Sequence, residues 1–288
     1  MEERRARTAV DPAAAPSAPA LAFDRITCTF AARATAKGDE SGRYTAVQDA
    51  TLAVVPGEFV SVVGPTGCGK STLLNVAAGL LAPSAGSVTV FGVPLEGLNR
   101  SAGYMFQTDA LMPWRSALSN VTAGLEFRGT RRDVAEAKGR EWLARVGLAG
   151  FEHRYPHQLS GGMKKRVALA QMLILDPQIL LMDEPFSALD VQTRQLMENE
   201  LLDLWNADRK SVLFITHDLE EAISLSDRVI VLSAGPATRP IGEFAIDLPR
   251  PRDVAEIRMT PRFVELHGAI WRKMKAEVLK GYAQSREA

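Results

Sequence analysis

The sequence predicts an α/β fold in which a parallel sheet carries a phosphate-binding loop. Residues 64–72 read GPTGCGKST and match the pattern G-x-x-x-x-G-K-[ST], and the apolar run at 58–63 supplies the strand that should precede such a loop. Short β-rich runs alternate with helical segments along most of the chain. Far downstream, residues 179–186 read ILLMDEPF, a buried strand that ends in two carboxylates. Together these features predict a nucleotide-binding α/β core.

Length and composition suit one large α/β domain or two lobes, with 288 residues of which 46% are apolar. The 34 basic and 34 acidic residues cancel, so no overall positive field favours nucleic acid. The two cysteines, Cys28 and Cys68, lie far apart and indicate a reducing compartment without a disulfide framework. No run approaches the ~20 apolar residues of a membrane span. We therefore expect a soluble intracellular protein that reaches a membrane only through a partner.

The chain is expected to begin with a tail and two edge strands. Residues 1–20 are charged and then rich in Ala and Pro, which predicts a disordered tail and not a secretory signal. Strand-like runs at 21–30 and 47–55 flank a small, polar segment at 31–43, which predicts a flexible loop between them. After the phosphate loop and its helix, a turn leads into a further strand at 87–92.

The middle of the chain is expected to be a mostly helical insertion at about 108–158, because β-branched runs become scarce there and helical spacing appears. After it, βα alternation returns. The expected elements are helices at 161–175, 191–206 and 219–225 and strands at 179–182, 212–216 and 229–232. A helical tail is predicted at 251–288, after a main domain at 21–250. Its apolar face at 261–279 should dock on the chain's own core, with a partner surface as the alternative.

The phosphate loop predicts how a nucleotide would be held. Its backbone N–H groups converge on phosphate oxygens at the positive end of the following helix. Lys70 is long enough to reach the terminal phosphates, and the Ser71 hydroxyl is placed to ligate Mg²⁺. A chance match to this pattern is expected in about one chain in a hundred, and the flanking strand and helix make it rarer. The nucleotide-binding candidates in the loop are Gly64, Pro65, Thr66, Gly67, Cys68, Gly69, Lys70, Ser71 and Thr72.

Polar side chains at the ends of other strands are candidates for chemistry. Successive strand residues point to opposite faces, so Asp183 is predicted to face the Mg²⁺ shell of Ser71 and Glu184 the attacking water. A solvated turn is the alternative for that pair. His217 ends a core strand, at the edge where ligands bind in open α/β sheets, and could donate a hydrogen bond to the γ-phosphate. Gln107 ends another strand and could ligate Mg²⁺ or orient water.

Residues 159–163, LSGGM, precede a helix whose first turn is basic. Ser160 is an N-cap candidate, and the glycines after it permit close approach of the backbone to an anion. Because basic residues in a first turn oppose the helix dipole, a bound phosphate is one explanation for them. The other is an ordinary capped helix.

The ordered set of motifs resembles an ABC-type ATPase subunit over about residues 30–232: GPTGCGKS, Gln107, LSGGM, ILLMDEP, the SALD turn at 187–190 and His217. The resemblance implies a P-loop NTPase (RecA-like) core with an antiparallel β edge subdomain and a helical insertion subdomain. It also implies that two copies close head to tail, so that each ATP lies between one subunit's phosphate loop and the other's signature. The implied contacts across that interface are Ser160, Gly161, Gly162, Met163 and Asp190.

By the same resemblance, Glu184 would be the general base, with Gln107 and His217 as further catalytic residues. The cofactors implied are ATP and Mg²⁺, the metal being held by Ser71, Gln107 and Asp183.

One aromatic residue and two departures complete the comparison with the family. An aromatic ring after the first strand stacks on adenine in this family, and Phe30 is the first candidate, with Tyr44 the second. The signature has Met163 where the family usually has Gln, and Gln171 stands where Arg is usual. The second departure removes a positive charge near the signature helix and leaves the strength of the closed dimer open.

More narrowly, residues 109–129, 154–163 and 180–194 resemble the ATPase subunits of nitrate, sulfonate, taurine and bicarbonate importers. In that family the helical region forms a groove for a coupling helix of the membrane subunit. The candidates to line it are Leu111, Met112, Pro113, Trp114 and Tyr155, for which core packing is the alternative. The implied partners are a second ATPase subunit (a homodimer), two transmembrane permease subunits and, indirectly, an external substrate-binding protein. The implied location is peripheral, at the cytoplasmic face of the inner (plasma) membrane.

Two alternatives share the ATPase chemistry. An exporter or lipoprotein-release ATPase would carry the same catalytic residues. An ABC ATPase acting on nucleic acid or the ribosome is disfavoured by the single module, the short insertion and the zero net charge. We therefore expect no nucleic-acid partner.

Overall fold

The structure, a computed structural model, describes residues 18–31 and 42–286. The tail predicted at 1–20 and the loop predicted at 31–43 lie largely outside the described residues. The strands are β1 (Leu21–Ala31), β2 (Arg43–Val54), β3 (Phe59–Val63), β4 (Ala85–Val90), β5 (Val93–Pro94), β6 (Ala102–Met105), β7 (Ile179–Asp183), β8 (Ser211–Ile215), β9 (Arg228–Leu232) and β10 (Pro240–Ala245). The helices are α1 (Lys70–Ala77), α2 (Ala117–Phe127), α3 (Arg132–Arg145), the 3₁₀ turn η1 (Pro156–Gln158), α4 (Gly161–Leu173), α5 (Val191–Ala207), α6 (Leu219–Leu225), α7 (Val254–Ile257) and α8 (Pro261–Arg286).

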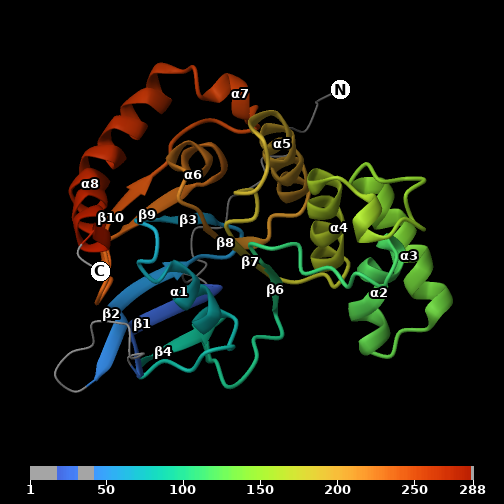
Figure 1. Cartoon of the computed structure of the whole chain (residues 1–288), viewed down its shortest axis with the longest axis horizontal. Coiled ribbons are helices and arrows are strands. Elements are labelled where there is room, and N and C mark those ends of the chain that lie inside the picture. Colours follow the sequence, from blue (N-terminus) through green and yellow to red (C-terminus); the bar gives the residue numbers. More distant parts are fainter. Residues whose placement is uncertain (1–17, 32–41, 287–288) are drawn as a thin grey trace, which may run out of the picture.

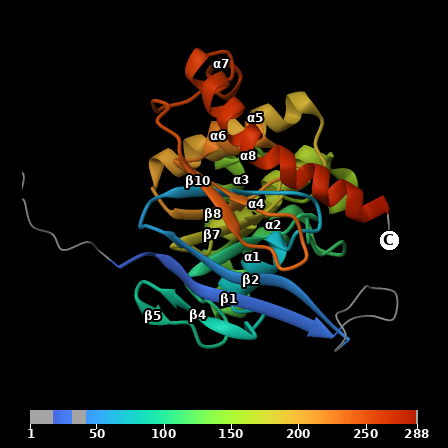
Figure 2. The ribbon, with the colours of Figure 1, turned by 90° about the vertical axis from the view of Figure 1, so that its left-hand side faces the viewer.

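The strands form two sheets of different character. One is antiparallel with the order β2-β1-β4-β5, and the other has the order β10-β9-β3-β8-β7-β6. In the second sheet the strands from β9 to β6 run parallel, and β10 pairs antiparallel with β9. Figure 2 shows the antiparallel sheet as a separate layer below the parallel one. The predicted α/β fold with an antiparallel edge subdomain is confirmed.

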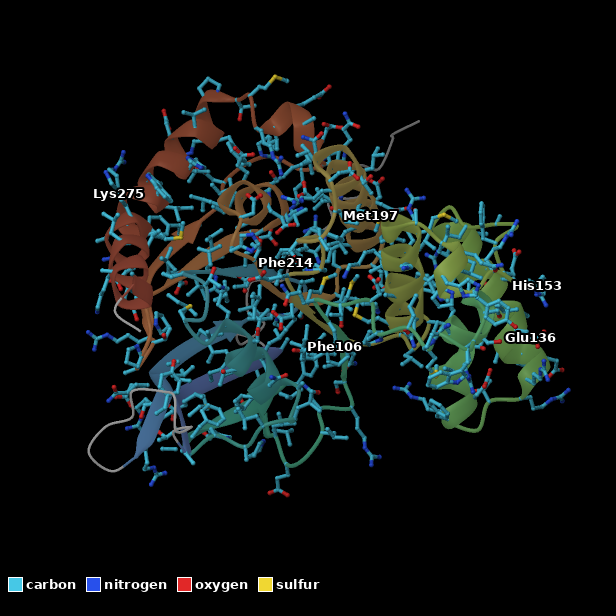
Figure 3. All side chains as sticks on the ribbon, in the orientation of Figure 1. Phe106, Glu136, His153, Met197, Phe214 and Lys275 are labelled. Carbon is cyan, nitrogen blue, oxygen red and sulfur yellow. The ribbon has the colours of Figure 1, made fainter. Side chains whose placement is uncertain are left out.

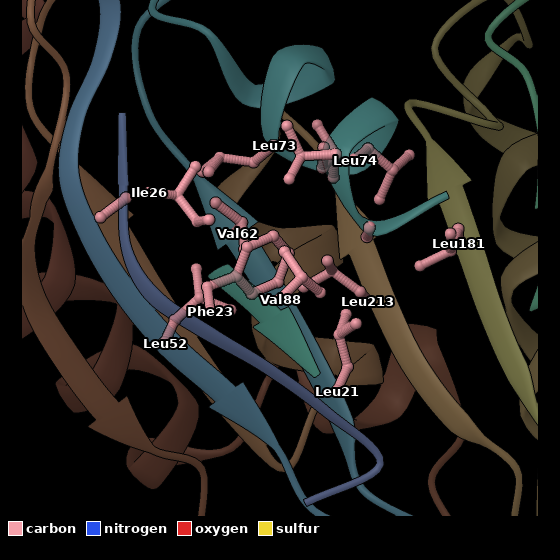
Figure 4. Close-up of a cluster of buried hydrophobic side chains, with 14 of the residues drawn as sticks. Leu21, Phe23, Ile26, Leu52, Val62, Leu73, Leu74, Val88, Leu181 and Leu213 are labelled. Atoms are coloured by element: carbon pink, nitrogen blue, oxygen red, sulfur yellow. The ribbon is translucent and has the colours of Figure 1, made fainter. Parts of the chain in front are cut away.

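An apolar layer lies between the antiparallel sheet, α1 and one face of the parallel sheet (Figure 4). Val60 and Val62 of β3 point into it, together with Leu73 and Leu74 of α1 and Phe23 of β1. Since successive strand residues point to opposite faces, the residues between them must be covered from the other side. All five residues of β3 are buried, as expected for a parallel strand covered on both faces.

The opposite face of the parallel sheet is covered by α4 and α5. Phe59 of β3 and Phe214 of β8 point to this side with ring centroids 5.7 Å apart, and Trp205 of α5 meets Phe59 edge-on at 5.7 Å. Aromatic pairs of this kind add about 0.5–1.5 kcal/mol beyond the area that they bury. The indole N–H of Trp205 donates to the carbonyl of Lys210 at 2.7 Å, so the buried ring keeps its hydrogen bond.

The insertion between β6 and β7 forms a helical lobe of α2, α3 and α4, at the right of Figure 1. Ser116 caps α2 by accepting a hydrogen bond from the Ser119 N–H at 3.3 Å. Gly139 lets α3 lie close to α2, because a Cβ there would be 2.7 Å from side-chain atoms of Leu118 and Thr122. Because α4 buries one side in this lobe and the other against the parallel sheet, the packed lobe extends past the predicted end near residue 158.

The C-terminal helix α8 packs on α6, β9 and β10 (Figure 1). Its predicted apolar face is buried on the chain's own core, with Phe263, Leu266, Ile270 and Met274 inside. The helix lies within the helical tail predicted at 251–288 and continues beyond the last apolar position near residue 279. Its C-terminal half lies beside the phosphate loop, where a Cβ on Gly281 would be 3.4 Å from the Pro65 side chain.

The start of β2 also differs from the prediction. The strand begins at Arg43 and not at residue 47, because Tyr44 and Thr45 pair with Phe30 and Thr29 of β1. Partners contributed by a distant strand extend the ladder beyond the local apolar run. The other predicted elements differ from the observed ones by a few residues at their ends, which is the usual scatter of element boundaries.

We expect Ile270→Ala to lower the free energy of unfolding by about 2–5 kcal/mol, because it removes a buried side chain and leaves a cavity. Ile270 lies on the inner face of α8 and is fully buried. Val264→Ala, on the same helix at a position that is 62% exposed, is the matched control and should change stability little. Urea unfolding of the two variants measures the difference. Equal midpoints would contradict the packing of α8 on the core.

Candidate active site

Four neighbouring parallel strands end at the same edge of the sheet, and each delivers a polar group there. The order β3-β8-β7-β6 places their carboxyl ends side by side. The phosphate loop follows β3, His217 follows β8, Asp183 and Glu184 end β7, and Gln107 follows β6. Ligands in open α/β sheets bind at this edge. The topology therefore gathers the loop and the predicted polar residues into one site.

The phosphate loop is shaped by its glycines and by Lys70. Gly67 and Gly69 have φ angles of +75° and +101°, a region that residues with a Cβ rarely adopt. A Cβ at position 69 would also lie 3.1 Å from the Val47 side chain. Lys70, only 5% exposed, donates to the carbonyls of Gly64 and Pro65 at 3.0 Å each. Its ammonium group is thus held at the centre of the loop.

Ser71 and Asp183 form a pair of oxygen donors beside the loop. The Ser71 hydroxyl donates to Asp183 Oδ1 at 3.1 Å. Burial raises the pKa of Asp183, and the nearby Glu184 adds to this, while the Ser71 hydrogen bond and Lys70 oppose it. A hydroxyl, a partly buried carboxylate and the neighbouring amide of Gln107 are the hard oxygen ligands that Mg²⁺ prefers. These residues fit a magnesium ion, which would stabilise the charged form of Asp183.

Three side chains converge on Glu184. Its Oε2 lies 2.9 Å from His217 Nδ1 and accepts from Gln107 Nε2 at 3.4 Å, and its Oε1 lies 3.8 Å from Lys70 Nζ. Glu184 has a φ angle of +42°, an uncommon value for a residue with a Cβ, and its N–H is fixed by a 2.9 Å bond to the Ile215 carbonyl. Backbone strain of this kind concentrates at functional sites. The position of the carboxylate is therefore fixed by these side-chain contacts and by the backbone conformation of Glu184.

The signature residues lie elsewhere, at the start of α4. Ser160 caps this helix by accepting from the Met163 N–H at 3.3 Å, and Asp190 caps α5 by accepting from the Thr193 N–H at 3.0 Å. A Cβ on Gly162 would be 2.7 Å from the Thr193 side chain, so this glycine lets the two caps pack together. Ser160, Gly161 and Asp190 are exposed. Figure 1 shows α4 well separated from α1, which follows the phosphate loop.

Lys165 is a site residue that sequence reasoning missed. It is 2% exposed, and its Nζ donates to the main-chain carbonyl of Gln107 at 2.6 Å and lies 3.3 Å from Asp109 Oδ1. A bound phosphate was one explanation for the basic first turn of α4, but the structure gives Lys165 and Arg166 of that turn partners within the chain. The sequence did carry a signal for the burial of Lys165, which stands four and seven residues before Leu169 and Met172 and so lies on their buried face of the helix.

The two candidates for the adenine-stacking ring lie directly opposite each other on β1 and β2. Phe30 is 38% exposed. A Cβ on Gly235 would lie 3.6 Å from the Tyr44 hydroxyl and 3.7 Å from Cys68 Cα, so the Tyr44 hydroxyl lies near the phosphate loop. The roles of Phe30 and Tyr44 both stay predictions.

The predicted groove residues are split between surface and core. Trp114, 74% exposed, and Tyr155, 42% exposed, line one hollow of about 460 Å³ between α2 and α3. Pro113 is exposed beside them, and Met112 is half-buried, with its N–H donating to Asn120 Oδ1 at 2.8 Å. Leu111 packs instead against the apolar clusters of the core and the lobe.

A second hollow, of about 740 Å³, lies on the core side of the helical lobe and was not predicted. Three of its lining residues are large, apolar and exposed: Leu80, Leu98 and Phe106, at 54%, 65% and 45%. Figure 3 shows Phe106 at the junction between β6 and the helical lobe. Exposed apolar groups gathered in this way mark interaction surfaces.

The parallel sheet, the phosphate loop and the acid pair at the end of β7 define a P-loop ATPase. Residues 47–187 match the family model described as ABC transporter. The uncharacterized ABC transporter ATP-binding protein MJ0412 of Methanocaldococcus jannaschii is 47% identical, over 83% of this chain and 87% of that protein. The chain therefore belongs to the ABC transporter family, as an ATP-binding subunit that hydrolyses ATP.

Two further comparisons narrow the kind of protein. The taurine import ATP-binding protein TauB of Burkholderia pseudomallei is 43% identical, over 82% of this chain and 92% of its own length. The dimeric, post-hydrolysis structure of the ATP-binding cassette MJ0796, bound to ADP and Pi, covers 80% of this chain and all of that one. It is 30% identical, with a TM-score of 0.68. The resemblance that the motifs predicted is confirmed.

Proposed function

We propose that the chain works as a dimer closed around two ATP molecules and drives import of a small anion or organic solute through separate membrane subunits. One observation supports the proposal: the predicted site residues of one chain fall into two separate groups. The phosphate loop, Glu184 and His217 meet at one edge of the sheet, whereas the signature at Ser160 is exposed elsewhere. A second copy, turned head to tail, supplies the missing half of each site.

In this reading Glu184 is the general base. It takes a proton from the attacking water as the water oxygen forms its bond to the γ-phosphorus, and the bond from that phosphorus to the bridging oxygen of ADP breaks. His217 and Gln107 hold the carboxylate in place, and Lys70 balances charge on the phosphates. Mg²⁺, held by Ser71, Asp183 and Gln107, supplies positive charge to the phosphate oxygens when bound.

The import assignment comes from the relatives. TauB proteins, named for taurine import, are 43–47% identical to this chain. We therefore place the transported solute in the nitrate, sulfonate and taurine class, delivered by an external binding protein, with the chain at the cytoplasmic face of the membrane. Within the residues that the structure covers, no helix combines the length and the apolar character needed to cross a membrane. We propose that the path for the solute lies in separate membrane subunits.

An exporter or lipoprotein-release role is the second candidate, since it requires the same catalytic residues. Reconstitution separates the two. With the membrane pair of a taurine-type importer and its binding protein in proteoliposomes, addition of solute should stimulate ATP hydrolysis and drive uptake. Stimulation only by membrane proteins of an export system, without uptake, would overturn the import assignment.

The membrane subunit is proposed to dock on the helical lobe at the hollow lined by Trp114 and Tyr155. A coupling helix is a short segment that can bury aromatic side chains, and interface energy concentrates on such anchors. The second hollow is lined by Phe106, the residue that directly precedes Gln107, and by Arg128 at the end of α2. Contact there would let movement of the lobe reach Gln107.

We expect Trp114→Asp to leave ATP hydrolysis by the isolated subunit within about twofold but to weaken assembly with the membrane pair by about a hundredfold. Loss of an aromatic anchor costs about 2 kcal/mol or more, and the new carboxylate would have to be buried unpaired. Phe127→Asp, at an exposed ring at the end of α2 that lines neither hollow, is the control. Quantitative co-purification measures the effect. Full assembly of the Trp114 variant would remove this docking surface.

A further inference from the structure

Lys165 joins two elements that serve different parts of the active site. It lies in α4, the helix that begins at the signature, and its Nζ donates to the Gln107 carbonyl at 2.6 Å. Asp109 Oδ1 lies 3.3 Å from the same ammonium group. Burial lowers the pKa of Lys165, and Asp109 opposes this effect. A buried ammonium is costly unless it is paired, so Lys165 holds these two partners firmly.

The side chain of Gln107 points the other way, toward the catalytic carboxylate. Its Nε2 donates to Glu184 Oε2 at 3.4 Å, while its own carbonyl is bound by Lys165. A continuous path therefore runs from the exposed signature end of α4, through Lys165 and Gln107, to Glu184. Two hydrogen bonds link the residues of this path, Lys165 Nζ to the Gln107 carbonyl and Gln107 Nε2 to Glu184 Oε2, and the rest of it runs through the covalent chain of α4 and of Gln107.

We propose that Lys165 is a positioning residue that couples the two ATP sites of the dimer. The inference rests on the proposed function, in which α4 of one chain presents its signature to the ATP held by the other chain. Gln107 and Glu184 of the same chain serve its own ATP. A shift of α4 caused by ATP at the first site is then passed by Lys165 to Gln107 at the second. This is coupling between two binding sites through an element that both of them bias.

The test is Lys165→Met, which keeps the length and apolar stem of the side chain but removes the ammonium group. Asp109, with a side chain that is 31% exposed, can turn to water, so no buried charge is left alone. We expect kcat to fall about tenfold, the loss of one charged hydrogen bond. The Hill coefficient for ATP should fall from near two toward one, and nucleotide affinity of the isolated monomer should stay within about twofold.

Two more variants define the result. Lys165→Arg, which keeps the charge and the donors, should restore cooperativity, and Lys138→Met, an exposed lysine of the same lobe, should match the parent. Lys165→Leu carries the same expectation as the methionine variant, in case that one fails to fold. A cooperative Lys165→Met enzyme, or a loss that Lys165→Arg fails to rescue, would overturn the inference. If the parent itself neither dimerises with ATP nor hydrolyses it cooperatively, the proposed function fails before any variant is compared.

Discussion

Glu184→Gln should reduce ATP turnover about a hundredfold or more while leaving ATP binding intact, because a general base contributes on that scale. The amide keeps the shape of the carboxylate and can still hydrogen-bond His217 and Gln107, but it cannot take a proton. Steady-state hydrolysis and nucleotide binding measure the two effects separately. Since cleavage is blocked after ATP is bound, the variant should also accumulate as an ATP-dependent dimer, visible by size-exclusion chromatography.

The control for this variant is Glu141→Gln, at an exposed position of α3 far from the acid pair. It removes the same charge and should hydrolyse ATP at the parent rate. Near-parental hydrolysis by Glu184→Gln would reject Glu184 as the base. A variant that binds ATP but stays monomeric would reject the dimer and leave the base assignment standing.

Lys70→Ala should weaken ATP binding about a hundredfold, because the ammonium group is the buried cation at the centre of the phosphate loop. A charged hydrogen bond is worth about 1.5–3 kcal/mol, and tenfold in affinity corresponds to about 1.4 kcal/mol. The change also removes the cation that lies 3.8 Å from Glu184 Oε1. Titration with a fluorescent ATP analogue measures the affinity.

Lys275→Met, an exposed lysine of α8 labelled in Figure 3, is the control and should bind ATP as the parent does. Unchanged affinity of Lys70→Ala would mean that the loop does not hold the phosphates.

The order of the main elements could be predicted because a short local run of the sequence specifies each of them. The run FVSVV, the glycines after it and the DE pair after ILLM specify a strand, a loop and a strand end without reference to distant residues. At the start of β2, pairing with β1 determines where the strand begins, and the prediction from the local sequence placed this boundary four residues late. Pairing between residues far apart in sequence cannot be read from a single window.

The meeting of the predicted polar residues at one edge of the sheet could be predicted for a similar reason. Parallel strands put their carboxyl ends at one edge, so polar residues at those ends could be assigned to one site before any distance was known. The contact of Lys165 with Gln107 could not be predicted from the sequence, because the acceptor is a main-chain carbonyl 58 positions earlier. Side-chain identity says nothing about which backbone oxygen lies opposite. The groove was predicted only in part for the same reason, since Leu111 and Trp114 are both apolar yet only Trp114 is exposed.

Both native thiols of the chain are hidden. Cys28 and Cys68 are each 2% exposed, and burial raises the pKa of both, so each is covered and held in its unreactive protonated form. A cysteine introduced on the open surface, for example at Leu196 on α5, would be the first group that a maleimide finds. Spectroscopic labels on such cysteines could therefore measure distances between two chains, while Cys68 in the phosphate loop stays unmodified.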